Sequence, residues 1–364
     1  MDGFVYHAAV DSPTFLISTQ LRRSLLGRLL FRGIEVVRAN DSPSGGESRA
    51  INQAAMDLAL NHLREGRRLA IFPEGTSDLG PRHLPFHSGA ARLAVRCVEQ
   101  GIPLRLIPLG IHYDCAWCFG SSVEVVIGPT IPLAEETAGM SASSRVVYCK
   151  RRITEALGEV GVNFADAGVQ QDVERMAFLA ADINKDSFFG YLKAWEEGLP
   201  PPLSERWSTL FEAVKGRIHL RYRNIPLYPE RGLLRTVVCF CLTAPTALLA
   251  VCCNIGPVVA VFLAGKYLPD GQNVVALWRI LIGVPVLLSW GLIWLGVSLT
   301  TAGPALSCGY LLLTCIGLRV VPKSLRSGIA LFNALFCPVG SAPFDAVAKV
   351  LRKTAVCDSH GVGS

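Results

Sequence analysis

A carboxylate, a glycine and a hydroxyl follow one another where an apolar run of the sequence ends. Residues 69–72 lead directly into Pro73, Glu74, Gly75 and Thr76. Glycine adopts backbone conformations that other residues avoid, so the chain can approach a ligand closely at this point. A helix expected to begin near Ser88 would present unpaired backbone N–H groups, which suit an anion such as phosphate. The sequence therefore predicts an anion-binding strand tip.

These residues resemble the third motif of the glycerophospholipid acyltransferase family, whose members move fatty acyl groups from acyl-CoA to glycerol phosphates. The resemblance continues in residues 85–91, Pro-Phe-His-Ser-Gly-Ala-Ala. His87 stands where many relatives carry a lysine, so a phosphate contact there would depend on pH, and Arg82 could supply the missing charge. The substrate-binding residues that the resemblance implies in this region are Phe72, Pro73, Glu74, Gly75, Thr76, Arg82 and His87.

Two further motifs of the family have counterparts in the chain. Residues 33–38 resemble the strand whose final arginine, here Arg38, holds the phosphate headgroup. A planar guanidinium suits that role because it meets a phosphate with two hydrogen bonds; the alternative is a surface arginine at a strand end. Residues 106–110 resemble the fourth motif, in which Pro108 would line the acyl-CoA site, although packing alone could explain it. Residues 119–122 lack the arginine found in long-form relatives, so one phosphate-directed charge is missing.

The catalytic base of the family is a histidine assisted by an aspartate five residues later. The candidate here is His7 with Asp11, which leaves three intervening residues instead of four. Residues four apart face each other on a helix, so a contact between the two remains possible. The resemblance implies that His7 removes the acceptor hydroxyl proton while Asp11 orients its ring. Either the chain is abbreviated at this end or the true motif has been lost.

The elements that must position these residues alternate between strand and helix over residues 1–160. Strand patterns occur at 33–38, 68–72, 104–112 and 123–127, with helical spacing of apolar residues over 51–63 and 90–99. Such alternation predicts an α/β fold. The resemblance implies the mixed sheet flanked by helices of the glycerol-phosphate acyltransferases. The motifs cover residues 7–135, and the likeness continues more loosely to the C-terminus.

Residues 161–230 have the pattern of a helical linker. Val173, Met176, Leu179 and Ile183 share one helical face. The run 182–186 resembles the beginning of a calcium loop, but the glycine and the final glutamate that an EF-hand needs are both missing. We therefore interpret this run as a polar junction between helices.

The C-terminal third is apolar and basic. Residues 1–230 contain 25 basic and 26 acidic side chains, whereas residues 231–364 contain 10 basic and 3 acidic ones. Residues 236–265 and 280–318 carry no charge, and about 20 apolar residues cross a bilayer as a helix. The predicted organisation is an acyltransferase domain at 1–160, a linker at 161–230, a membrane domain at 231–326 and an amphipathic tail at 327–364. Within the membrane domain we expect a broken hairpin at 236–265 and helices at 280–299 and 304–321.

The positive-inside rule gives this region an orientation. Basic residues flank both apolar blocks, and the turn near 300–304 is neutral, so the turn is expected outside and the tail inside. A single crossing by residues 236–265 would place the tail opposite the catalytic domain, and we favour the hairpin. Six of the twelve cysteines lie in the apolar blocks and are interpreted as small hydrophobic residues. Cys115 and Cys118 have the spacing of a redox pair, but no thioredoxin-like helix surrounds them.

Together these patterns predict a multi-pass membrane protein whose catalytic domain faces the cytosol, on the endoplasmic reticulum or another internal membrane in a eukaryote. The resemblance implies an O-acyltransferase of phospholipid biosynthesis. Its donor would be acyl-CoA or acyl carrier protein, and its acceptor glycerol 3-phosphate or 1-acylglycerol 3-phosphate (lysophosphatidate). It would need no cofactor beyond acyl-CoA as co-substrate and no metal, and its other partner would be membrane lipid, not nucleic acid. A catalytically impaired scaffold is the alternative. A serine lipid hydrolase is disfavoured because the chain has no Gly-x-Ser-x-Gly run.

Overall fold

The computed structural model describes most of the chain, and every structural statement below concerns that part. The described residues are 2–11, 13–19, 33–37, 45–76, 78–230, 232–301 and 303–354. The chain divides into two compact units. The first, the N-terminal unit, contains Met1–His112 and Val125–Asn163, and the second, the helical unit, contains Tyr113–Glu124 and Phe164–Ser364.

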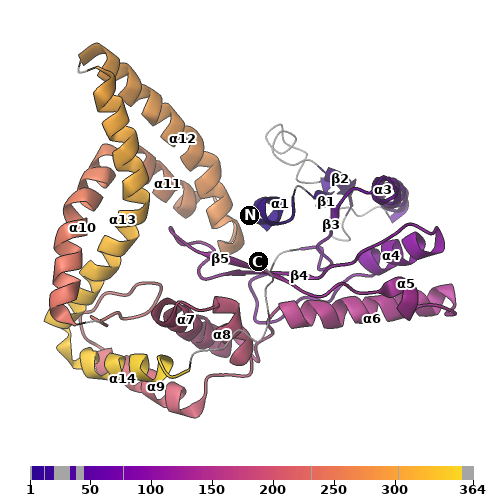
Figure 1. Cartoon of the computed structure of the whole chain (residues 1–364), viewed down its shortest axis with the longest axis horizontal. Helices are drawn as coiled ribbons and strands as arrows, with labels where there is room; N and C mark the ends of the chain where they lie inside the picture. The colour runs from indigo at the N-terminus through magenta and orange to yellow at the C-terminus, as the bar shows by residue number, and fades with distance from the viewer. Residues whose placement is uncertain are drawn as a thin grey trace. The chain divides into compact units, whose positions relative to one another are not determined.

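The N-terminal unit alternates helices and strands, as the sequence predicts (Figure 1). Its elements are α1 (Asp2–Ala9), β1 (Thr14–Ser18), β2 (Gly33–Val36), α3 (Gly45–Arg64), β3 (Leu69–Ala70), α4 (Gly89–Glu99), β4 (Leu109–Tyr113), β5 (Val123–Ile127), α5 (Leu133–Glu136) and α6 (Ala142–Val160). The expected helices at 51–63 and 90–99 are present. Three of the strands are shorter than predicted among the described residues, where they cover 33–36, 69–70 and 109–113, and Leu106 forms an isolated bridge with Ile131.

The strands form two groups. β1 lies between β2 and β3, and both neighbours run parallel to it, with Phe15 opposite Gly33 and Ala70. β4 and β5 pair separately as a hairpin, whose tip is assigned to the helical unit. Parallel strands need helical crossovers, which explains why α3 separates β2 from β3 along the chain.

Helix α4 is the centre of the N-terminal core. It lies between α3 and α6 (Figure 1) and buries a face toward each. Leu93 and Cys97 pack with residues of α3, whereas Ala94 and Val95 pack with residues of α6. Burial on two sides fixes the direction of α4. Its first turn, immediately after the predicted motif, is therefore held in one place.

The helical unit begins with the predicted linker helices. These are α7 (Ala167–Asn184), α8 (Phe188–Ala194) and α9 (Pro201–Val214), joined near the C-terminus by α14 (Ser341–Leu351). Asp166 caps α7 by accepting from the backbone N–H groups of residues 168 and 169. Of the predicted apolar face, Val173, Met176 and Leu179 are fully buried. Proline at the start of α9 separates it from α8.

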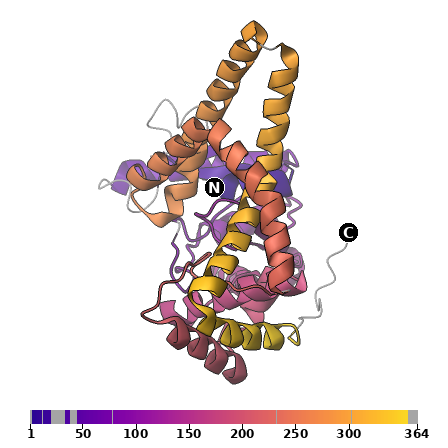
Figure 2. The same cartoon turned by 90° about the vertical axis from the view of Figure 1, so that its left-hand side faces the viewer.

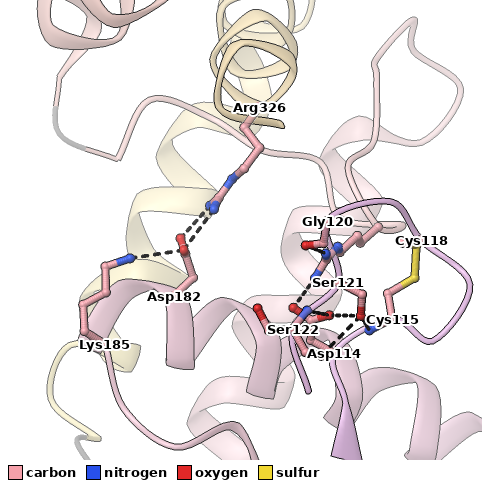
Figure 3. A network of polar contacts seen from close by, with 10 residues as sticks. Asp114, Cys115, Cys118, Gly120, Ser121, Ser122, Asp182, Lys185 and Arg326 are labelled. Atoms are coloured by element: carbon pink, nitrogen blue, oxygen red, sulfur yellow. Dashed lines mark hydrogen bonds and ion pairs between the residues drawn. A yellow bond between two sulfur atoms is a disulfide. The ribbon is translucent and has the colours of Figure 1, made fainter. Parts of the chain in front are cut away.

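The run 182–186 is a helix junction, as the sequence indicates. α7 ends at Asn184, and Lys185 adopts a left-handed conformation. The Asp182 carboxylate accepts from Arg326 at 2.9 and 2.5 Å and from Lys185 at 3.3 Å (Figure 3). Burial disfavours the charged form of Asp182, but the hydrogen bonds and charges of Arg326 and Lys185 outweigh it and hold the pKa below its usual value.

The hairpin tip differs from the expectation for its cysteines. Cys115 and Cys118 form a disulfide (Figure 3), although no thioredoxin-like helix pattern surrounds them in the sequence. Next to the disulfide, Asp114 pairs with Arg223 at 2.5 Å, and the Arg223 guanidinium also donates to the carbonyl of Gly120 at 3.0 Å. The tip is therefore secured by charge as well as by covalent bonding.

Four apolar helices follow the linker: α10 (Leu233–Cys253), α11 (Ile255–Tyr267), α12 (Gln272–Thr301) and α13 (Pro304–Phe336). Within the described residues, three segments are long and apolar enough to cross a membrane, namely Leu233–Cys253, Val274–Thr301 and Ala305–Phe336. α12 and α13 meet at the turn that joins them and diverge away from it (Figure 2). α10 packs along α13, and α11 packs along α12. Both α12 and α13 exceed the predicted ranges, since α12 begins at 272 and α13 continues to 336.

Candidate functional site

The predicted motif forms a tight turn after β3. The N–H of Gly75 donates to the carbonyl of Phe72 at 3.1 Å, and the N–H of His87 donates to the carbonyl of Pro73 at 2.8 Å. The Glu74 carboxylate accepts from the backbone N–H of Leu84 at 3.3 Å. These bonds fold the segment 84–87 back onto the turn. Residues about ten positions apart in the sequence therefore share one small region.

Gly75 meets the steric need that the sequence predicts for it. Its φ is +72°, where side chains other than hydrogen are strained. A Cβ at this position would lie 3.1 Å from a ring carbon of His87. The imidazole of His87 thus rests directly against the turn. Both residues precede α4, whose capping residue Ser88 makes no side-chain cap and whose first turn has no acidic residue.

The helix that carries His7 packs against the same motif. Tyr6 is buried, and its ring centroid lies 5.8 Å from that of Phe72, which in turn stacks on Phe15 at 6.0 Å. The Tyr6 hydroxyl donates to the carbonyl of Leu109 at 3.4 Å. His7, the next residue, is exposed. The aromatic contacts therefore bring α1 to the Phe72 turn while its histidine faces solvent.

Asp11 lies beyond the end of α1, which stops at Ala9. Its φ is +50°, so the helical spacing assumed for the pair with His7 does not extend to it. The Asp11 carboxylate accepts from Arg68 at 2.8 Å, and the same guanidinium nitrogen donates to the carbonyl of Val10 at 3.1 Å. Arg68 immediately precedes β3 and therefore links β3 to the segment between α1 and β1.

The remaining predicted residues are Pro108, Arg82, Thr76 and Arg38. Pro108 is buried and its carbonyl accepts from the N–H of Gly128 at 2.9 Å, so its visible contacts are internal packing. Arg82 and Thr76 are exposed in the loop between β3 and α4. Arg38, which the resemblance assigns to the phosphate, lies outside the described residues.

Two residues near the site were missed by the sequence reasoning. Tyr6 and Arg68 connect α1 to the motif, and neither was predicted as a site residue, although Arg68 begins the predicted strand 68–72. A buried aromatic directly before the candidate base was a possible signal for Tyr6. Arg68 gave none, because its partner is 57 residues away in the chain. Among the described residues no cluster of three or more potential metal ligands occurs.

Comparison with known proteins addresses the same region. Residues 1–112 match a family model described as Acyltransferase. Residues 1–112 are an acyltransferase-family domain. An uncharacterized acyltransferase of Schizosaccharomyces pombe is 29% identical over 112 residues, a match that covers 29% of this chain and 17% of that protein. The aligned part is thus about a sixth of the relative. No solved structure matches the chain.

The acyltransferase match contains the Phe72–Thr76 turn, the start of α4 and the helix that carries His7. It ends at residue 112 and does not include the linker or the apolar helices. The resemblance identified from the motifs is therefore supported at the level of the acyltransferase family.

Proposed function

We propose that this protein is a membrane-bound O-acyltransferase of phospholipid biosynthesis that acylates glycerol 3-phosphate or 1-acylglycerol 3-phosphate. The donor is acyl-CoA; an acyl group carried on acyl carrier protein is the alternative donor, because it is also a thioester. The observation that carries the proposal is the Phe72–Thr76 turn, which folds against His87 at the start of α4 inside an acyltransferase-family domain.

The acceptor phosphate is assigned to the space in front of this turn. The absence of a Cβ at Gly75 lets a ligand approach the backbone, and the first turn of α4 offers N–H groups with a favourable dipole. Arg82, His87 and Arg38 supply the positive charge. One oxygen of Glu74 is held by Leu84, and Oε1 bonds none of the described residues. Oε1 therefore suits a glycerol hydroxyl, not the phosphate.

His7 is assigned the role of general base. Its imidazole takes the proton of the acceptor hydroxyl, and the resulting alkoxide forms an ester bond with the acyl carbon. The thioester carbon–sulfur bond breaks, and the imidazolium returns the proton to the departing thiolate. Asp11 is assigned by resemblance to support the charge on the imidazolium; in the structure its carboxylate accepts from Arg68. Pro108 belongs to the acyl-CoA side of the site by resemblance.

The apolar helices are assigned to the membrane, with every charged end on one side. α10 packs antiparallel to α13, since Cys239 meets Ser327 and Ala250 meets Gly317. α11 packs antiparallel to α12, since Gly256 meets Trp290 and the backbone of residue 265 meets Arg279. Five basic residues of these helices therefore lie in the halves remote from the α12–α13 turn, namely Arg235, Lys266, Arg279, Lys323 and Arg326, and Arg319 lies near the middle of α13.

The break between α10 and α11 supports a hairpin that dips into the bilayer and returns. α11 has 13 residues, which span only about 20 Å and cannot cross a bilayer core of about 30 Å. Backbone groups inside a bilayer must find partners within the protein. Here the carbonyl of Cys253 accepts from Trp290 at 2.8 Å and from Trp294 at 3.3 Å, and Asn254 is held by Tyr310 at 2.7 Å.

This arrangement leaves the N-terminal unit and the tail on the same, positively flanked side. By the positive-inside rule that side is the cytosol. We place the protein in an internal membrane, such as the endoplasmic reticulum, where acyl-CoA is available on the cytosolic face. An acyl chain would then reach the site from the adjoining leaflet.

A non-catalytic scaffold is the alternative, and one observation favours it. The Asp11 carboxylate is already paired with Arg68, so it is not committed to His7. The full-length protein in nanodiscs, with radiolabelled palmitoyl-CoA and each acceptor, separates the two functions. Acyl-ester product supports the enzyme. Failure to form product with either acceptor supports the scaffold, and free fatty acid without acceptor would identify a thioesterase.

Gly75→Ala tests the observation that carries the proposal. We expect acyl transfer to fall about tenfold to a hundredfold, because the new methyl meets His87 and blocks close approach to the backbone. Gly66→Ala is the matched control, since Gly66 has a similar φ of +74° but nothing lies within 4 Å of its added Cβ. Equal activity in the two variants would contradict the assignment of the turn to the acceptor site.

A further inference from the structure

A short basic segment immediately precedes the first apolar helix. Residues 215–221, here called the basic loop, place Lys215, Arg217, His219 and Arg221 at alternate positions. The chain contains no acidic residue between Glu212 and Glu230. Ile218 and Leu220 alternate with these basic residues, whereas a charged segment that only faces water usually lacks such apolar side chains.

The structure holds the basic loop in place against the end of α13. Asn333 is completely buried, and its side-chain oxygen accepts from the N–H of Leu220 at 2.7 Å. Its amide nitrogen donates to the carbonyls of Leu220 at 2.8 Å and Leu227 at 2.9 Å. One buried side chain therefore satisfies both backbone groups of Leu220. These hydrogen bonds hold the loop backbone in one conformation, in which its side chains are exposed.

Apolar and basic side chains alternate on the exposed surface of the loop. Ile218 is 77% exposed and Leu220 44% exposed. Arg217 and Arg221 are also exposed. Arg221 donates to a ring nitrogen of His219 at 2.9 Å and lies over the ring of Phe211. Among the described residues no carboxylate lies within ion-pair distance of Arg217 or Arg221, whereas Lys215 is paired with Glu212.

The basic loop continues the apolar surface of α10 and α13. Asn333 lies near the end of α13, where Leu335 and Phe336 are 70% and 65% exposed. The first turn of α10 carries Leu234, which is 78% exposed, and the exposed Arg235. An exposed apolar surface that ends in unpaired arginines has the chemistry of the boundary between acyl chains and charged headgroups.

We propose that the basic loop binds the anionic surface of the bilayer. Arg217 and Arg221 pair with the phosphates and carboxylates of anionic lipids, while Ile218 and Leu220 enter the boundary between headgroups and acyl chains. The inference rests on the proposal that α10 and α13 are embedded in a membrane. It does not rest on acyl transfer, so an inactive protein leaves it standing.

Hydrogen exchange of the backbone amides in 215–221 tests this proposal on the full-length protein in nanodiscs. A single basic residue near an anionic surface strengthens attraction about fivefold. We therefore expect exchange to be at least about tenfold slower in discs containing phosphatidylserine than in discs of phosphatidylcholine alone. The difference should disappear in about 1 M salt, where the Debye length is about 3 Å.

Three variants make the test specific. Arg217→Gln with Arg221→Gln removes both charges and should abolish the slowing, whereas Arg217→Lys with Arg221→Lys keeps the charges and should retain it. Arg206→Gln removes an exposed arginine of α9 outside the loop and is the matched control. Exchange of α7, whose core residues are fully buried, reports whether each variant is folded.

Equal exchange in the two kinds of disc would overturn the proposal. If that equal exchange is also slower than in detergent, the loop inserts through its apolar side chains without recognising charge, and the proposal is still overturned. Adding inorganic phosphate to phosphatidylcholine discs completes the design. Slowing there would assign the arginines to a soluble phosphate and not to the bilayer surface.

Discussion

Two ion pairs of similar length have different surroundings. Arg68 and Asp11, near the candidate site, are 2.8 Å apart, with side chains 58% and 86% exposed. Arg223 and Asp114, in the helical unit, are 2.5 Å apart, with side chains 7% and 10% exposed. Exposed pairs are weakened by water and salt, whereas a buried charge depends on its partner. The pair near the candidate site is thus open to water and solutes, whereas the buried pair fixes the backbone of the hairpin tip.

Removal of the candidate base should have the largest effect on activity. We expect His7→Gln to lower the rate of acyl transfer about a hundredfold to ten-thousandfold, the usual contribution of a general base. Its thermal unfolding should be unchanged, because His7 is exposed on α1. Initial rates and a melting curve of the same preparation measure both. Undiminished activity would show that another group takes the proton.

Breaking the buried pair should have the largest effect on stability. Asp114→Asn leaves the Arg223 charge buried without its carboxylate, which costs about 3–5 kcal/mol in comparable cases. The free energy of local opening, measured by hydrogen exchange across the hairpin tip and α7, should fall accordingly. Asp11→Asn is the matched control from the exposed pair. A similar loss in both variants would remove the distinction between the two regions.

Asp182 adds a pH dependence to the helical unit. Its pKa is lowered in the folded protein, so its contribution to stability is present above the unfolded pKa and is lost as pH falls through the folded one. Asp182→Asn should lower stability near neutral pH by about 1.5–3 kcal/mol, because Arg326 loses its hydrogen-bonded carboxylate. Below about pH 4 the difference from the natural protein should shrink. A difference that is constant with pH would contradict this assignment.

The smallest expected effect belongs to the exposed pair itself. Arg68→Gln should change activity less than about fivefold, as expected for a pair in water. Arg67→Gln is the control, because the neighbouring Arg67 pairs with Glu65 at the surface. A loss with Arg68→Gln as large as that with His7→Gln would mean that the position of Asp11 controls the base. The comparison between exposed and buried pairs would then fail.

Local patterns predicted the local parts of this structure. The helix at 90–99 and the strand at 123–127 follow from the spacing and type of their side chains, and the turn at Gly75 follows from a glycine after a strand. Sequence also identified the acyltransferase family. The extents of strands were less accurate, because pairing depends on neighbouring strands and not on the residues themselves. The disulfide at Cys115 was missed because its spacing alone is ambiguous.

The amino-acid sequence by itself determined the apolar C-terminal third, the basic side chains around it and the identity of the glycine motif, since hydropathy, charge and backbone freedom belong to residues. Tertiary structure alone decided which distant groups meet. In the folded chain Tyr6 packs against Phe72, the Asp11 carboxylate accepts from Arg68, and Asn333 accepts from the N–H of Leu220. Such contacts join residues far apart in the chain, so their partners are chosen only when the core packs.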